Sequence, residues 1–151
     1  MAVAIIYVKT YMNDVKSYAL LFAALADVNR LRLLHLMREG EICVCFLQGT
    51  LQSNQPKISR HLAYLRRAGL AQATRRGKWM YYSLKPQSPE VERLLAQALA
   101  LLAEEPVVRK DARRAKQIQC APARFGLPDP KMDQGRPRAQ PDHNGCGCGA
   151  E

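Results

Sequence analysis

The sequence predicts a mainly α-helical domain that carries one small β-hairpin. Apolar residues recur with helical spacing in several segments between residues 17 and 103, and capping residues bound these segments. Two short strand-like segments flank a Gly-containing tip, which is the pattern of a hairpin. A chain of 151 residues is long enough for one such domain with a real hydrophobic core and additional segments.

The first three helices are predicted from apolar spacing and capping signals. Residues 17–26 place leucines and alanines on one side of a helix. Asp27 is a suitable N-cap for the second helix, and Gly40 follows the last apolar residue of that helix. A short third helix is expected over about residues 43–51.

The fourth helix is predicted to start at a cap provided by Ser53 or Asn54 and to run to about Ala68. Pro56 is tolerated because it falls in the first turn. Residues 70–74 and 79–84 form the two expected strands around the tip at residues 75–78.

Ser88 and Pro89 begin the last predicted helix, whose apolar side extends from Val91 to Leu102. Four helices, a hairpin and a final helix in a domain of this size indicate a winged helix-turn-helix.

Charge is distributed unevenly along the chain, whose formal net charge is +10. Residues 42–89 contain no Asp or Glu but eight basic residues: Lys57, Arg60, Arg66, Arg67, Arg75, Arg76, Lys78 and Lys85. A basic block without interspersed acids is typical of a surface that binds a polyanion. Double-stranded DNA is therefore the expected partner.

The fourth helix has one apolar and one polar side. Ile58, Leu62 and Leu65 recur at i, i+4 and i+7 and would face the core. The opposite side carries the residues expected at DNA: Gln55, Lys57, Ser59, Arg60 and Tyr64. Gln pairs with adenine and Arg with guanine in the major groove, whereas Lys and Ser more often hold phosphates.

Arg75, Arg76 and Lys78 at the hairpin tip are expected to contact a neighbouring phosphate backbone or the minor groove. His61 lies next to the buried stripe of the fourth helix. We interpret it as a partly buried, hydrogen-bonded histidine rather than as a ligand or a switch.

Five cysteines, at positions 43, 45, 120, 146 and 148, include two C-x-C pairs. Two cysteines separated by one residue seldom bridge each other well, and no secretory signal precedes them. The residues that begin the chain are also too few to span a membrane. Reduced thiols in the cytoplasm are therefore expected, rather than a disulfide framework.

Cys43 and Cys45 precede the basic helix by one helix, so a soft-metal site and a DNA-reading element lie close together in the sequence. On an ideal helix, residues i and i+2 point about 200° apart. If both cysteines lie in regular helix, binding of one ion to both must unwind its first turn and tilt the DNA-reading helix. A helix N-terminus would also lower a thiol pKa.

Several motifs resemble the arsenic-responsive repressors of the ArsR/SmtB family. They are ALADVNRLRLL at residues 24–34, EICVCFLQ at 41–48, NQPKISRHL at 54–62 and GKWMYYSL at 77–84. The resemblance implies a homodimeric repressor, paired through its first and last helices, that leaves operator DNA when As(III) or Sb(III) binds as inducer. No other cofactor and no membrane partner is implied.

The chain departs from the family pattern where the third cysteine would align with Gln48. Trivalent arsenic and antimony favour soft thiolate ligands, and Cys43 and Cys45 supply only two of the three expected. The third could come from Cys120, Cys146 or Cys148, from a second subunit, or from a small-molecule thiol. Cys120 is preferred because it stands alone, close after the last predicted helix.

Two other functions remain open: a DNA-binding regulator that senses oxidation of the cysteine pair, and a thiol-rich metal carrier that delivers through Cys146 and Cys148. An enzyme is not expected, because the sequence shows no Ser/His/Asp grouping, no H-E-x-x-H and no P-loop. We divide the chain into an N-terminal extension (1–16), a DNA-binding and dimerisation domain (17–103) and a mobile, Cys-containing tail (104–151). In the tail, residues 107–118 could instead extend the last helix.

Overall fold

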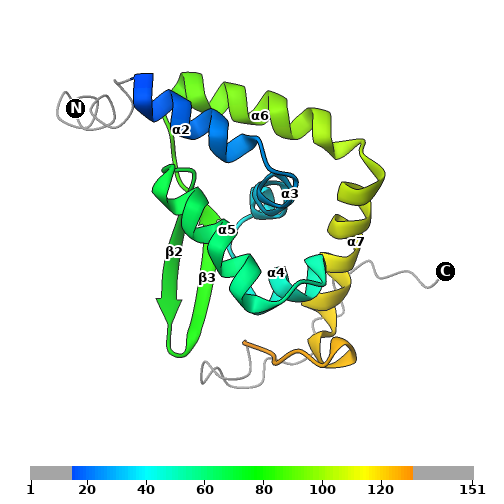
Figure 1. Ribbon diagram of the computed structural model, residues 1–151. Helices are drawn as coiled ribbons and strands as arrows, with labels where there is room; N and C mark the ends of the chain where they lie inside the picture. Colours follow the sequence, from blue (N-terminus) through cyan, green and yellow to red (C-terminus); the bar gives the residue numbers. More distant parts are fainter. Residues whose placement is uncertain (1–14, 131–151) are drawn as a thin grey trace.

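The computed structural model describes residues 15–130, in which a small antiparallel sheet projects at one edge of a group of helices (Figure 1). The helices are α2 (Val15–Leu25), α3 (Val28–Leu36), α4 (Val44–Leu51), α5 (Gln55–Arg67), α6 (Pro89–Ala103) and α7 (Pro106–Cys120). The strands are β1 (Ile42–Cys43), β2 (Ala71–Arg76) and β3 (Trp79–Leu84), and the 3-10 segments are η1 (Met37–Glu39) and η2 (Pro122–Phe125). The predicted winged helix-turn-helix is confirmed, with α4 and α5 as its helix pair and β2–β3 as its wing.

The sheet has three strands in the order β1-β3-β2, where the sequence predicted only a hairpin. In the added pairing, Ile42 lies opposite Tyr82, and Cys43 lies opposite Tyr81. The prediction that a helix begins at Cys43 was wrong by one residue, because Cys43 ends β1 and α4 begins at Val44. Two residues are too few to show the alternation that identifies a strand.

The predicted N-caps of two helices are confirmed. The Asp27 carboxylate accepts a hydrogen bond from the backbone N–H of Arg30 at 2.9 Å, which fixes the start of α3. Of the two candidates for α5, Asn54 is the cap, and its side-chain oxygen accepts from the N–H of Lys57 at 3.1 Å. The first turn of α5 contains Pro56, as expected.

The wing is a two-stranded ribbon whose register runs from Ala71 opposite Leu84 to Arg76 opposite Trp79. Gly77 has a φ of +58°, which lets the chain reverse within two residues. Arg75 and Arg76 therefore belong to strand β2, and the tip is shorter than the predicted one at residues 75–78.

Residues 106–120 form a packed helix, so the prediction of a mobile tail was wrong for this segment, and the alternative of a helix over residues 107–118 is confirmed. Helix α7 runs from the end of α6 down to α4 (Figure 1) and buries Val108, Ala115 and Ile118. Its buried Asp111 accepts two hydrogen bonds from Arg32 of α3, at 2.6 and 2.8 Å. Residues 1–14 and 131–151 lie outside the described residues, so the expectations for the N-terminal extension and for the tail are not tested there.

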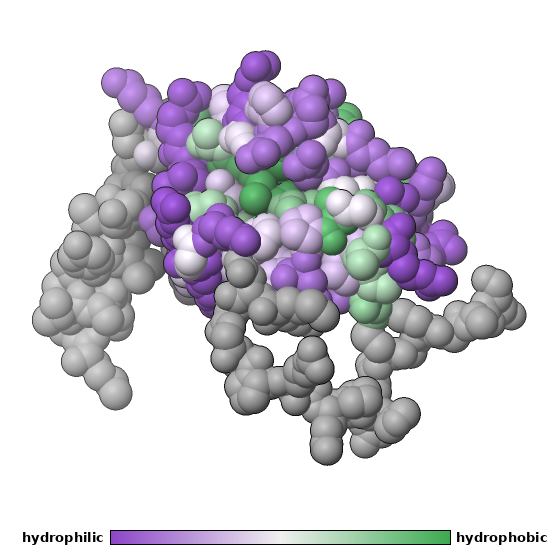
Figure 2. Space-filling model, turned by 90° about the horizontal axis from the view of Figure 1, so that it is seen from below, coloured by the Kyte–Doolittle hydropathy of each residue, from purple (hydrophilic) through white to green (hydrophobic). Residues whose placement is uncertain are grey.

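The surface combines a polar face with apolar side chains on two helices. The face seen from below in Figure 2 is mostly hydrophilic, with some apolar side chains near its centre. On α2 and α6, large apolar residues remain exposed, among them Phe22 at 55% and Leu101 at 78%. Within residues 15–130, no helix combines the length and apolar character needed to cross a membrane.

Candidate functional site

Helix α5 turns its basic side to solvent because its apolar side is fixed in the core. Ile58, Leu62 and Leu65 are buried, as the sequence predicted. The residues expected at DNA on the opposite side are exposed, except for the half-buried Tyr64: Gln55, Lys57, Ser59 and Arg60. The structure thus leaves this side of the helix available to a groove of DNA, and the contacts themselves stay a prediction.

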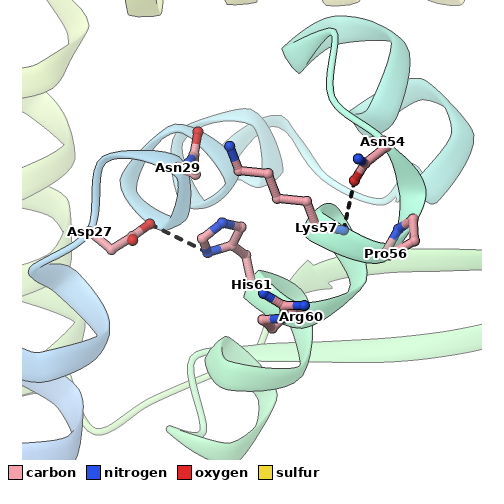
Figure 3. A pocket seen from close by; sticks show the side chains of 7 residues that line it. All are labelled: Asp27, Asn29, Asn54, Pro56, Lys57, Arg60 and His61. Carbon is pink, nitrogen blue, oxygen red and sulfur yellow. Dashed lines mark hydrogen bonds and ion pairs between the residues drawn. The ribbon is translucent and has the colours of Figure 1, made fainter.

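A concavity of about 550 Å³ lies between the starts of α3 and α5. Figure 3 shows Lys57 and His61 directed from α5 toward α3, with Asn29 on the far wall. Nδ1 of His61 lies 3.4 Å from Oδ1 of Asp27, the residue that caps α3. The expectation of a partnered, partly buried histidine is therefore confirmed.

Tyr64 has a packing role that the sequence did not suggest. Its ring lies between two guanidinium groups, 4.2 Å from that of Arg30 and 4.7 Å from that of Arg67. Arg30 is held in place by the carbonyl oxygen of Ala24, to which its Nε donates at 2.8 Å. Arg67 was missed as a site residue, although its position three residues after Tyr64 places both on one side of α5.

The basic residues of the wing differ in how they are held. Nε of Arg75 donates to the carbonyl oxygen of Gly77 at 2.9 Å, and Nζ of Lys78 lies 5.2 Å from the Trp79 ring centroid. Arg76 forms an ion pair with Glu41 and stacks over the Tyr81 ring at 4.9 Å. Glu41 was not singled out from the sequence, and it connects the wing to the segment that carries Cys43.

Cys43 and Cys45 converge because they belong to different elements. Cys43 has an extended backbone, with φ −64° and ψ 141°, and Cys45 lies in the first turn of α4. Their Sγ atoms are 2.7 Å apart. The expectation that the first turn must unwind before both sulfurs can bind one ion was therefore wrong, since its premise placed both residues in regular helix.

The two thiols differ in acidity: Cys43 loses its proton more readily than an ordinary cysteine, and Cys45 less readily. The pKa of Cys43 is lowered to about 7, mainly because the Cys45 thiol donates a hydrogen bond to its sulfur, with help from the N–H groups of Cys45 and Phe46. The pKa of Cys45 is raised, because its proton is held by Cys43 and because the group is partly buried. One thiolate and one thiol therefore coexist near neutral pH, which favours reaction with a thiophilic ligand.

Comparison with known proteins identifies the family of the chain. Residues 27–73 match the arsR family of bacterial regulatory proteins. The arsenic resistance transcriptional regulator ArsR2 of Pseudomonas putida is 39% identical over 104 residues, which cover 68% of this chain and 90% of that protein. The chain belongs to the ArsR family.

Two further relatives support the family assignment. The arsenical resistance operon repressor of Escherichia coli is 51% identical over 70 residues, 46% of this chain, and the match spans only 60% of that protein. The homodimeric winged helix-turn-helix domain of Mb0332 from Mycobacterium bovis superimposes with a TM-score of 0.52 at 30% identity, covering 59% of this chain and 81% of that one. These relatives are transcriptional regulators and not enzymes.

The ArsR-matched segment, residues 27–73, contains both the basic helix and the thiol pair, but not Cys120. Cys120 is the last residue of α7, is exposed and is disulfide-bonded, so the expectation of reduced thiols was wrong for this cysteine. Among residues 15–130, no group of three or more His, Cys, Asp or Glu side chains is placed to hold a metal ion. The structure thus brings Cys43 and Cys45 together and does not join Cys120 to them, while Cys146 and Cys148 lie outside the described residues.

Proposed function

We propose that this ArsR-family chain is a metalloid-responsive repressor that binds operator DNA as a homodimer and leaves it when As(III) or Sb(III) binds its cysteine thiolates. The observation that carries the proposal is the pair of sulfurs, 2.7 Å apart, at the base of the wing. Arsenic relatives in the family support the identity of the inducer. Thiolates are the soft ligands that such an ion prefers.

Exposed apolar residues support the homodimer. Tyr18 and Phe22 on α2, and Leu94 and Leu101 on α6, are 36–78% exposed in the single chain. Exposed large apolar side chains of this kind are typical of a protein–protein interface. A two-fold dimer through these helices would present two α5 helices to half-sites one helical turn apart. A monomer in sedimentation at micromolar concentration, with operator binding intact, would overturn this part.

The route from the thiols to DNA runs through the sheet. Cys43 pairs with Tyr81 of β3, and the Tyr81 ring carries Arg76 of the wing. Glu41, two residues before Cys43, holds the same arginine. A ligand that moves β1 would therefore change the position of the wing, whereas α4 is held by α7 through the hydrogen bond from Arg114 to the Gly49 carbonyl oxygen at 2.9 Å.

The decisive experiment is a fluorescence-polarisation titration of operator-bound protein with arsenite and antimonite, on wild type and on single Cys→Ser variants. Cys43→Ser and Cys45→Ser should each bind DNA normally and lose the release. Cys120→Ser should do the same if it supplies the third thiol, and removal of residues after 140 should then have little effect. If truncation abolishes the response and Cys120→Ser retains it, the third ligand is Cys146 or Cys148. A normal arsenite response of Cys43→Ser refutes the proposal.

A redox sensor is the second candidate, because the short Sγ–Sγ distance and the lowered pKa of Cys43 also favour oxidation of the pair. An oxidant such as diamide would then release the operator without any metalloid. Release by arsenite under a phosphine reductant, with no release by diamide, decides for the metalloid. A thiol-rich metal carrier is separated from both by the absence of specific duplex binding.

A further inference from the structure

Helix α7 carries a basic surface outside the segment that matches the ArsR family. The match ends at residue 73, and α7 begins at Pro106. Residues 106–128 contain six basic residues and a single acid, Asp111. That acid is buried and accepts two hydrogen bonds from Arg32 of α3, so its charge is neutralised inside the molecule. No other carboxylate in this segment offsets its exposed cations.

The cations of α7 lie on the side that faces solvent. The buried positions of the helix recur at i, i+3, i+7 and i+10, which leaves the opposite side exposed. The exposed basic residues of the helix are Arg109, Lys110, Arg113 and Lys116. Within residues 15–130, Arg109 is the only one of them that forms an ion pair, with Glu104. The other three follow one another at spacings of three residues, so they extend over about 9 Å of the helix axis.

This basic surface lies next to the helix pair that is expected at DNA. Arg114 of α7 donates a hydrogen bond from its Nε to the carbonyl oxygen of Gly49 in α4, at 2.9 Å. Helix α7 packs against α4, α4 packs against α5, and α5 packs against β2 of the wing. Helix α7 therefore lies on the side of the helix pair away from the wing (Figure 1).

A duplex bound by α5 would bring phosphates to both sides of that helix. A helix in the major groove has one sugar-phosphate backbone on each side, and the wing supplies cations on one of these sides only. Double-stranded DNA carries one negative charge per about 1.7 Å of its axis, so a row of cations of this length can meet several phosphates. The opposite charge that suits α7 is thus provided by the DNA itself.

We propose that Lys110, Arg113 and Lys116 form a second DNA-contacting surface, which binds phosphates of the duplex on the side of α5 away from the wing. The inference rests on the proposed operator binding and adds a contact from a helix beyond the family match. Phosphate contacts position a protein on DNA and do not read its sequence. Helix α7 therefore raises the affinity for every duplex and leaves the preference for the operator unchanged.

The test is a triple variant of the full chain, Lys110→Ala, Arg113→Ala and Lys116→Ala, in fluorescence polarisation with operator and scrambled duplexes. All three residues are exposed, and alanine is the best helix former, so the fold is retained, which circular dichroism checks. Affinity for both duplexes should fall by the same factor, about tenfold at low salt. The slope of log affinity against log salt should decrease by about 1–3, because each phosphate contact adds about 0.9.

Two controls separate this contact from packing and from net charge. The triple variant Lys110→Arg, Arg113→Lys and Lys116→Arg keeps every charge and should bind as wild type. Arg113→Ala and Arg93→Ala each remove one exposed arginine, from α7 and from α6. Arg113→Ala should weaken binding and lower the salt slope, whereas Arg93→Ala should change both much less.

Hydroxyl-radical footprinting locates the contact on the operator. Wild type should protect backbone positions that the alanine triple variant leaves open, while protection by α5 and the wing stays. An unchanged salt slope in the triple variant, an identical footprint, or equal losses in Arg113→Ala and Arg93→Ala overturns the inference and leaves the proposed function in place. If wild type does not prefer the operator to a scrambled duplex, the proposed function fails, and the inference fails with it.

Discussion

Helices α4 and α5 follow each other in the chain but begin in different ways. The N-cap residue of α5 is Asn54, whose side-chain oxygen accepts a hydrogen bond from the N–H of Lys57. The N-cap residue of α4 is Cys43, which makes no side-chain capping hydrogen bond. Its sulfur instead faces a second sulfur and the first N–H groups of the helix.

The N-terminus of α5 is therefore held in place, whereas the N-terminus of α4 carries a reactive group. An oxygen cap satisfies a backbone donor and holds the helix in one position, which suits an element that must fit a DNA groove. A sulfur in the same place caps weakly but gains thiolate character from the same N–H groups. The chain thus places a rigid reading helix directly after a helix whose first residues can bind a ligand.

The largest effect on DNA affinity is expected from Arg60→Ala. Arg60 is exposed on the rigid helix and lines the concavity of Figure 3. Its loss should cost about 1–3 kcal/mol of operator binding and relax sequence preference. Competition binding with operator and scrambled duplexes measures both. Arg93→Ala is the control, because it removes the same charge from an exposed position on α6 and should leave operator affinity nearly unchanged. If Arg60→Ala bound the operator as tightly as wild type, the placement of the reading helix would be refuted.

The two helix starts can be compared directly by changing each cap. Asn54→Ala removes an oxygen cap and should lower the free energy of unfolding by about 0.5–2 kcal/mol. Cys43→Ser replaces sulfur with a better capping atom, so stability should fall by less than in Asn54→Ala, or rise. Urea denaturation with operator binding on each variant checks this. A larger loss in Cys43→Ser than in Asn54→Ala would show that the sulfur has a structural role that we do not assign to it.

Local signals were enough for the parts of the fold that are locally determined. Asp27 and Asn54 cap helices because their side chains reach backbone donors three residues away, and the buried stripe of α5 follows from spacing alone. Strand β1 could not be predicted, because its two residues are ordered by pairing with β3. Without β1, the prediction placed Cys43 in the helix, so the geometry of the two thiols could not be predicted.

Helix α7 was predicted only as an alternative to a mobile tail, over residues 107–118, for a different reason. Its buried positions are Val108, Asp111, Ala115 and Ile118, and one of the four is an acid. Such a stripe does not resemble an apolar face until Arg32, 79 residues earlier in the chain, is known to neutralise Asp111. The docking of α7 depends on this contact between residues distant in the sequence and could not be inferred from local sequence.

The thiol pair should give stability a specific dependence on pH. In the folded chain the pKa of Cys43 is lowered to about 7, below its ordinary value of 9.0, so its contribution grows between about pH 7 and 9 and is lost as pH falls through 7. The pKa of Cys45 is raised, so the unfolded chain releases that proton first and stability declines above pH 9. Denaturation at pH 6–10 should therefore show a maximum near pH 9 that the Cys43→Ser and Cys45→Ser double variant lacks.

The smallest effect, and the most specific for the route between the two regions, is expected from Glu41→Gln. Glu41 and Arg76 are both partly exposed, with side chains 33% and 47% accessible, so their ion pair contributes at most about 1 kcal/mol to stability. Removing the carboxylate frees Arg76 for phosphates and deletes a negative charge near the wing. Operator affinity should rise a few-fold at low salt, and the gain should shrink as salt increases.

Glu90→Gln is the matched control, because it makes the same charge change at an exposed ion pair on α6. It should alter affinity less than Glu41→Gln at every salt concentration. If movement of β1 weakens DNA binding through Arg76, the Glu41→Gln variant should also require a higher metalloid concentration than wild type to release half of the bound operator. Weaker operator binding by Glu41→Gln would mean that Glu41 positions Arg76 for DNA rather than competing with it, and the sense of the coupling would be reversed.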